Sequence, residues 1–108
     1  MNPLHAFDVS VQLIRQLREP VTRLQARDAD LASQIRRAAS SVPLNVAEAH
    51  RRVGRDRSHL FRVAAGSAAE VRAALLVAEA WGHVAQADVV DALASLDRLL
   101  AMLWRLTH

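Results

Sequence analysis

The sequence predicts an all-α protein that folds as one antiparallel, up-down-up-down four-helix bundle spanning residues 1–108. Along four segments, apolar residues recur at steps of three and four, the spacing that places side chains on one face of a helix. Glycine and proline number only three each, whereas helix-forming alanine, leucine and arginine are abundant. Short connections between the segments favour antiparallel neighbours, and 108 residues suit a single domain.

The first predicted helix begins between Pro3 and Phe7 and carries a seam of apolar residues at near-heptad spacing. The seam consists of Phe7, Val11, Ile14, Leu17, Val21 and Leu24. Pro20 interrupts this helix, because a proline ring removes one backbone hydrogen bond and clashes with the preceding turn. We therefore expect a kink or a break at Pro20, with residues 21–27 forming a second piece.

The second predicted helix runs to about Val53 and joins a buried seam to a basic outer face. Asp28 or Asp30 is placed to cap its first turn, and Gly54, which tolerates a left-handed backbone, ends it. Its seam consists of Leu31, Ile35, Ala38, Val42, Val46, Ala49 and Val53. Pro43 lies in the middle, so the expected helix is bent at that point and held together by packing.

The third predicted helix, residues 57–81, is apolar on two faces. One face forms a core seam of Leu60, Ala64, Ser67, Val71, Leu75 and Ala78. The opposite face carries the small apolar residues Ala65, Gly66, Ala69, Ala73, Leu76 and Ala80. A helix that is apolar nearly all round is usually buried on both sides, so we infer that a neighbouring subunit packs here. The alternative is that the alanines are simply good helix formers at exposed sites.

The fourth predicted helix follows Gly82, which closes the third, and has Asp88 and Asp91 in its first turn. Its seam consists of Val89, Leu93, Leu96, Leu100 and Leu103. Leu99, Trp104 and Leu106 widen the apolar surface beyond one stripe. Such a wide surface suits either a deep groove or a subunit contact.

The composition excludes several classes of protein. Without cysteine there are no disulfides and no thiolate metal sites. Asp8 and Arg15 interrupt the first apolar stretch, so we expect neither a signal peptide nor a membrane span, and a cytoplasmic protein is the default. The five histidines show no metal-ligand spacing, and the sequence contains no phosphate loop or nucleophile elbow. We therefore expect no enzyme, no catalytic residue, no metal and no cofactor.

Arginine supplies all fourteen residues of the Lys and Arg count, and the formal net charge is +3. Codon bias could account for the absence of lysine, but a guanidinium group also binds phosphate bidentately and stacks on bases. Basic residues concentrate between the second and third helices, and others lie on the outer face of the second. The candidate nucleic-acid contacts are Arg36, Arg37, Arg51, Arg52, Arg55 and Arg57. The alternative is a solvated loop whose arginines pair with Glu48 and neighbouring acids.

Four polar residues border the seams of the second and third helices: Asn45 and Glu48 on one, Ser67 and Glu70 on the other. Three-residue spacing puts each pair on one side of its helix, so we expect a buried polar network. Catalysis by Glu48 or Glu70 is the sharper alternative. A di-iron site is not expected, because no Glu-x-x-His motif occurs.

Two stretches carry a family resemblance: LASQIRRAASSVPLNVAEAHRR and RDRSHLFRVAAGSAAEVRAALLVAEAWGHV. Their pattern is Gln-hydrophobic-Arg-Arg-Ala, then Ser-hydrophobic-Pro-x-Asn-hydrophobic-Ala-Glu, then Gly-Ser-x-x-Glu. The matching residues are Gln34, Arg36, Arg37, Ala38, Ser41, Pro43, Asn45, Ala47, Glu48, Gly66, Ser67 and Glu70. The chain thus resembles the four-helix bundle proteins also called 23S ribosomal RNA intervening-sequence proteins. It departs from the family pattern at Ala49, where glycine is usual, and around Pro20.

The resemblance implies an antiparallel four-helix bundle that assembles into a homopentamer, in line with the two-faced third helix. Biochemical function in the family is largely unassigned. Some members are encoded inside ribosomal RNA genes, and a related group is the accessory protein of diversity-generating retroelements, where a basic pentamer binds a reverse transcriptase and nucleic acid. We therefore expect a homo-oligomer that binds RNA or DNA phosphates through arginine. A protein-interaction scaffold, for which nucleic acid is incidental, is the alternative.

Overall fold

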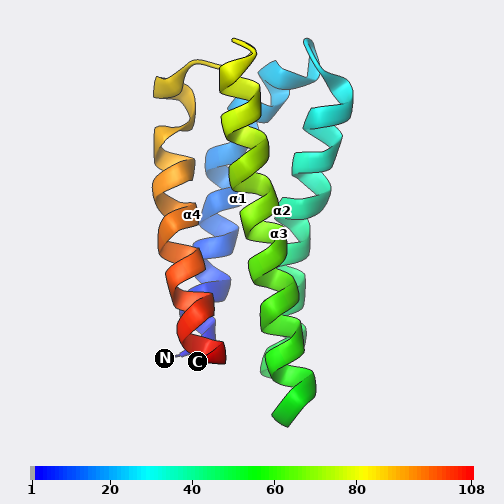
Figure 1. Ribbon diagram of the computed structural model, residues 1–108, viewed down its shortest axis with the longest axis vertical. Coiled ribbons are helices and arrows are strands. Elements are labelled where there is room, and N and C mark those ends of the chain that lie inside the picture. Colours follow the sequence, from blue (N-terminus) through cyan, green and yellow to red (C-terminus); the bar gives the residue numbers. More distant parts are fainter. Residues whose placement is uncertain (1) are drawn as a thin grey trace.

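Four helices make up the computed structural model, which describes residues 2–108. They are α1 (Pro3–Gln25), α2 (Ala29–His50), α3 (Gly54–Ala80) and α4 (Gln86–Thr107). Each helix packs against its neighbours in sequence, and α1 also packs against α4, so the helices form a closed ring about a common core. The bundle measures 42 × 22 × 19 Å (Figure 1). This arrangement confirms the predicted all-α four-helix bundle.

The two ends of the bundle differ in what they carry. One end holds the α1–α2 and α3–α4 turns, and the other holds the α2–α3 turn together with both chain termini (Figure 1). In Figure 1 the α2–α3 turn lies at the bottom, near the labels N and C. Residues far apart in sequence, such as those near positions 5, 55 and 105, therefore share one end of the molecule.

The core is built from one broad stripe of each helix, and Phe61 is its largest fully buried side chain. The predicted seams are right at most positions but too narrow. Leu60 and Ser67 are only partly buried, whereas Phe61 and Ala68 beside them are completely buried. In a four-helix bundle each helix touches two neighbours, so the buried stripe is wider than the single seam that spacing alone predicts.

Of the kink or break predicted at Pro20, the break is wrong, because α1 runs unbroken from Pro3 to Gln25. Pro20 lacks the amide that would donate to the carbonyl of Gln16, but its ring is buried in the bundle. Packing of the flanking Leu17 and Val21 in the core holds the helix together across the missing bond. Pro43 likewise lies buried within the continuous helix α2.

Several residues begin, cap or end the helices. Asp28 caps α2, with its carboxylate accepting a 3.0 Å hydrogen bond from the amide of Leu31. Helix α2 ends at His50, earlier than predicted, and Gly54 (φ +62°) begins α3 instead of ending α2. Gly82 (φ +76°) follows α3 in the left-handed conformation, as predicted. At the start of α4, the Asp88 carboxylate accepts a 3.2 Å hydrogen bond from the amide of Ala85.

Candidate nucleic-acid interface

The six arginines predicted to contact nucleic acid do not form one patch. Arg36 and Arg37 lie in the middle of α2, whereas Arg51 follows its last residue. Fifteen residues separate Arg36 from Arg51, which at the rise of an α-helix is about 22 Å. The structure therefore divides the candidates into a pair on α2 and a cluster at the α2–α3 turn, Arg51, Arg52, Arg55 and Arg57.

At the α2–α3 turn, acidic side chains neutralise only part of the positive charge. The carboxylate oxygens of Glu48 lie 3.8 Å from a guanidinium nitrogen of Arg51 and 3.0 Å from one of Arg52. Another guanidinium nitrogen of Arg52 lies 3.8 Å from a carboxylate oxygen of Asp56. These pairs are at least a third exposed, so each holds its arginine only weakly. Within residues 2–108, no carboxylate lies within 4.0 Å of Arg55. The predicted pairing of Glu48 with this loop is thus confirmed, but it leaves free guanidinium groups.

Arg57 is held differently from the other arginines of the turn. Its guanidinium carbon lies 5.5 Å from the centroid of the Phe61 ring, within the range of a cation–π contact. The side chain is half-buried, whereas Arg51, Arg52 and Arg55 are exposed. Arg57 therefore differs from its three neighbours in that an aromatic ring, and not solvent alone, contacts its guanidinium group.

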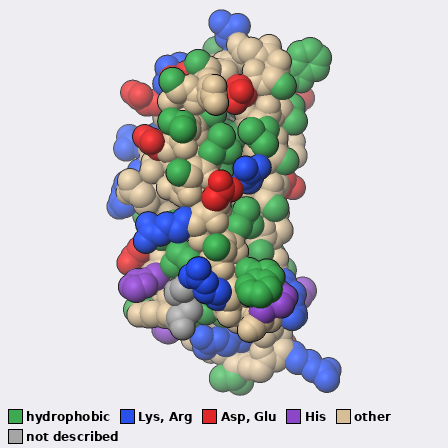
Figure 2. Space-filling model, turned by 60° about the vertical axis from the view of Figure 1, so that its left-hand side comes forward, with side chains coloured by type: hydrophobic (Ala, Val, Ile, Leu, Met, Phe, Trp, Pro, Cys, Tyr) green, Lys and Arg blue, Asp and Glu red, His purple; other side chains and the backbone are tan. Residues whose placement is uncertain are grey.

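Charge is distributed unevenly along the bundle. Residues 48–62 contain five arginines and two carboxylates, and residues 98–108 add two arginines without a carboxylate. We call this end, with the α2–α3 turn and the termini, the basic end. Residues 79–91, at the opposite end, contain three carboxylates and no arginine. On the face seen in Figure 2, the acidic side chains of the described residues lie in the upper two thirds, and the histidines gather in the lower third. A phosphate group would be drawn toward the basic end.

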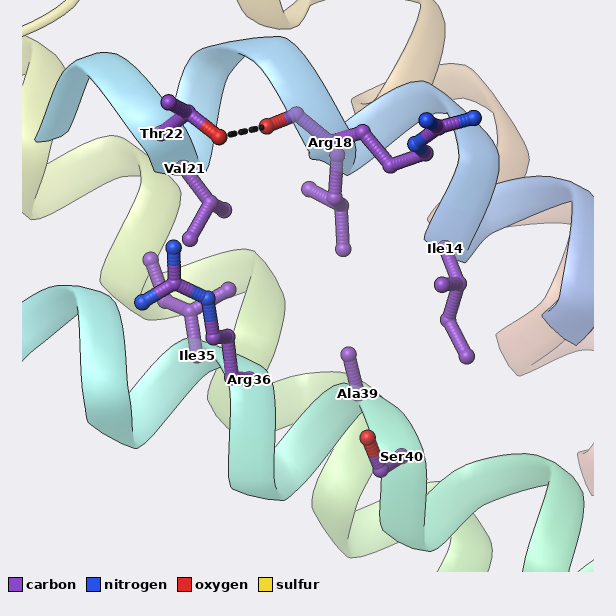
Figure 3. A pocket seen from close by; sticks show the side chains of 9 residues that line it. Ile14, Arg18, Val21, Thr22, Ile35, Arg36, Ala39 and Ser40 are labelled. Carbon is purple, nitrogen blue, oxygen red and sulfur yellow. Dashed lines mark hydrogen bonds between the residues drawn. The ribbon is translucent and has the colours of Figure 1, made fainter. Parts of the chain in front are cut away.

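A groove between α1 and α2 adjoins Arg36. It encloses about 340 Å³ and has an apolar floor made by α1 and α2. The floor consists of Ile14, Leu17, Val21, Ile35 and Ala39. Arg18 and Arg36 flank it with Thr22 and Ser40, and the Arg36 side chain extends toward Val21 of α1 (Figure 3). Arg36 also donates a hydrogen bond to the side-chain oxygen of Gln25.

Sequence reasoning missed the contribution of α1 to this basic surface. Arg15 and Arg18 are exposed, and within the described part of the chain neither has a carboxylate within 4.0 Å. Their three-residue spacing, off the apolar seam of α1, is the signal that could have found them. With Arg36 and Arg37 they make a second basic surface on the side of the bundle.

The predicted polar network exists in part. The Asn45 side-chain amide donates to the Ser41 hydroxyl (2.9 Å) and to the Ser41 carbonyl (2.8 Å), and the Ser41 hydroxyl lies 2.9 Å from that of Ser67. Ser41, which the network prediction omitted, is therefore its centre and links α2 to α3. Glu48 does not belong to the network, because its carboxylate forms ion pairs with Arg51 and Arg52. Glu70 is exposed and outside it too.

The small apolar face predicted on α3 is uncovered in the single chain. Gly66, Ala69, Ala73 and Leu76 are exposed, and Ala65 is half-buried. Nothing lies within 4 Å of the position that a Cβ atom would take at Gly66. Packing within the chain therefore gives no reason for a glycine at this position.

Two further properties of the described residues bear on function. Residues 2–108 contain no group of three histidine, aspartate or glutamate side chains placed to hold a metal ion. None of the four helices combines the length and the apolar character that crossing a bilayer requires.

The motif residues of the family resemblance lie on α2, from Gln34 to Glu48, and on α3, from Gly66 to Glu70. The family model of the 23S rRNA-intervening sequence protein matches residues 3–105. The chain belongs to this family. The match extends the resemblance seen on α2 and α3 to α1 and α4, and it names no activity. No curated protein matches the chain.

Among solved structures, the bundle is similar to that of a protein from Bacteroides thetaiotaomicron VPI-5482. That protein is described as one with unknown function from the S23 ribosomal protein family. The two structures share 16% sequence identity with a TM-score of 0.81, over 94% of this chain and 97% of the other. At this identity, the likeness supports the fold and carries no ligand across.

Proposed function

We propose that this family member is a non-enzymatic, homo-oligomeric protein of the cytoplasm that binds the phosphate backbone of RNA or DNA. The observation that carries the proposal is the basic end, where Arg55 has no acidic partner among residues 2–108, and Arg51 and Arg52 have only the exposed or half-buried Glu48 and Asp56. Exposed arginines of this kind attract polyanions with little regard to base sequence. We expect affinity that falls steeply as salt rises.

Assembly would multiply this modest charge. The proposed oligomer contact is the uncovered face of α3, Ala65, Gly66, Ala69, Ala73 and Leu76. A glycine without a packing role inside the chain is explained if a second backbone approaches it closely. The homopentamer that the family resemblance implies would repeat the basic end five times.

The test combines light scattering with a short RNA at low and at moderate salt. We expect an oligomer whose mass rises with RNA at low salt and returns to the protein's own mass at moderate salt. The variant Arg51→Gln, Arg52→Gln, Arg55→Gln should lose the RNA shift while keeping the oligomer. A matched control, Arg23→Gln, Arg27→Gln, Arg72→Gln, removes the same charge elsewhere and should keep the shift. Binding that is indifferent to salt, or lost equally in both variants, would contradict the proposal.

The α1–α2 groove favours a second candidate function, that of a protein-interaction scaffold or accessory subunit, for example of a reverse transcriptase. An apolar floor flanked by two arginines suits an amphipathic helix with acidic edges. Under this proposal, nucleic-acid binding is incidental. Arg18→Glu with Arg36→Glu should then abolish capture of the partner, while the triple arginine variant of the basic end should capture it normally. The reverse pattern would favour the first candidate.

A further inference from the structure

At the basic end, the start of α1 lies beside the end of α4 (Figure 1). A hollow of about 380 Å³ opens between the two helices. His5 lines it from α1, and Arg98, Ala101, Met102 and Arg105 line it from α4. Three of these five side chains carry nitrogen donors, and none is a carboxylate. The hollow therefore brings basic groups from both ends of the chain to one place.

The spacing of the lining residues on α4 explains why a hollow forms here. Arg98 and Arg105 are seven residues apart, so they lie on one face of α4, about 10.5 Å apart along its axis. Ala101, between them, is exposed, and its side chain is too short to fill the space. Met102 is buried and forms the floor. The two arginines therefore flank an opening with a small residue at its centre.

Nearby acidic side chains do not match the positive charge of this hollow. Within residues 2–108, neither Arg98 nor Arg105 has a carboxylate within 4.0 Å. The first turn of α1 contains no acidic residue, so the positive end of its helix dipole adds to the charge. Asp8 lines an adjoining hollow together with His5 and Arg98, but it forms no ion pair within the described chain. An anion in the hollow would thus meet guanidinium groups that no carboxylate occupies.

We propose that this hollow binds a terminal phosphate dianion, supplied either as the phosphorylated end of a nucleic-acid strand or as free phosphate. Arginine binds phosphate oxygens through paired N–H donors, and Arg98 and Arg105 approach one group from opposite sides. His5 donates through a ring N–H whether its imidazole is neutral or charged.

A terminal phosphate suits the hollow better than a phosphate within a strand. A phosphate monoester carries a charge of about −1.5 to −2 and offers three strong acceptor oxygens. A backbone phosphate carries a single charge, and the strand continues from it on both sides. The three donor side chains of the hollow therefore match the terminal group in charge and in oxygen atoms. The site is separate from the arginines of the α2–α3 turn, so it does not depend on the backbone binding proposed above.

The histidines supply the readout, because His5 lines the hollow and His83 lies at the opposite end of the bundle. Nuclear magnetic resonance of the histidine rings follows a titration with inorganic phosphate at fixed pH and ionic strength, with chloride as the exchanged anion. The spectrum of His5→Gln assigns the signals of His5. We expect a saturable shift of the His5 signals and no shift of the His83 signals.

Variants separate a built site from general attraction to positive charge. Arg98→Gln and Arg105→Gln should each weaken phosphate binding by roughly ten- to a hundredfold, because each removes a charge-assisted hydrogen bond. Ala101→Leu keeps every charge but fills the opening, so it should abolish the saturable shift. Arg27→Gln removes the same charge at the opposite end and should bind phosphate normally. All four positions are exposed, so circular dichroism should show the variants folded.

Two strands distinguish the two sources of the phosphate: a short oligouridylate with a 5′-phosphate and the same strand with a 5′-hydroxyl. Both are added to the variant Arg51→Gln, Arg52→Gln, Arg55→Gln, in which binding of the backbone is weakened. If the phosphorylated strand shifts the His5 signals at lower concentration than inorganic phosphate does, the strand end is the ligand. If inorganic phosphate is at least as effective, free phosphate is the ligand.

Three results would overturn the inference. They are His5 signals that phosphate shifts no more than chloride does, phosphate binding that is unchanged in both Ala101→Leu and Arg98→Gln, and a 5′-hydroxyl strand as effective as inorganic phosphate. Each of them leaves the proposed function standing, because salt-dependent binding of RNA through the α2–α3 turn is measured separately.

Discussion

A double-mutant cycle at Ser41 and Ser67, the polar link between α2 and α3, gives a sharp test of how these two helices pack. Their hydroxyls lie 2.9 Å apart and both side chains are partly buried. A neutral hydrogen bond contributes about 0.5–1.5 kcal/mol net, and partial exposure favours the lower half of that range. We therefore expect a coupling free energy of about 0.5–1 kcal/mol between Ser41→Ala and Ser67→Ala.

The cycle is needed because the single variants mix several effects. Each serine-to-alanine change also raises helix propensity by a few tenths of a kcal/mol, roughly, and this term cancels in the coupling energy. Asn45 keeps a partner in Ser41→Ala, since its amide still donates to the Ser41 carbonyl. The assay is urea unfolding of the four proteins at one fixed protein concentration, because assembly would otherwise shift apparent stability. A coupling energy indistinguishable from zero would refute the link, and Ser40→Ala, at an exposed neighbouring position, is the control.

Three further predictions concern stability and assembly. Phe61→Ala should lower the free energy of unfolding by about 3–5 kcal/mol, because it empties a fully buried site, and Leu60→Ala should cost clearly less; urea unfolding of both checks this. Asp28→Ala should lower the free energy of unfolding by about 1 kcal/mol through loss of the α2 cap, whereas Asp30→Ala should change it by no more than about 0.5 kcal/mol. Equal melting temperatures of these two variants would contradict the assignment of Asp28 as the cap. Gly66→Ala should raise the stability of the single chain by up to about 1 kcal/mol while lowering the oligomer mass in light scattering; an unchanged mass would remove Gly66 from the interface.

Sequence reasoning predicted the bundle because helix periodicity, caps and short turns all indicate the same fold. It was wrong about a break at Pro20, where the local rule against proline in a helix competes with burial of the ring in the core. Single-seam patterns also underestimated the core, since they placed Leu60 inside where the structure has Phe61. Which of two adjacent apolar residues faces inward depends on both neighbouring helices, and one helix's spacing does not contain that information.

The candidate site was harder to predict than the fold. The cluster of arginines at the α2–α3 turn was visible in the sequence, because its members are adjacent along the chain. The presence of Arg98 and Arg105 at the same end of the bundle was not, because it depends on the antiparallel return of α4. The polar network likewise depended on Ser41 facing Ser67 across two helices, a contact 26 residues apart in sequence.

The most direct test of the central claim is the salt dependence of binding to a short single-stranded RNA, measured by anisotropy between about 50 and 200 mM salt. For the unmodified protein we predict that log affinity falls linearly with log salt, by about 0.7 per phosphate neutralised. Arg55→Gln should reduce that slope by about one unit, whereas Arg27→Gln, at the opposite end, should leave it unchanged. A slope near zero, or one that both variants change equally, would contradict phosphate binding at the basic end.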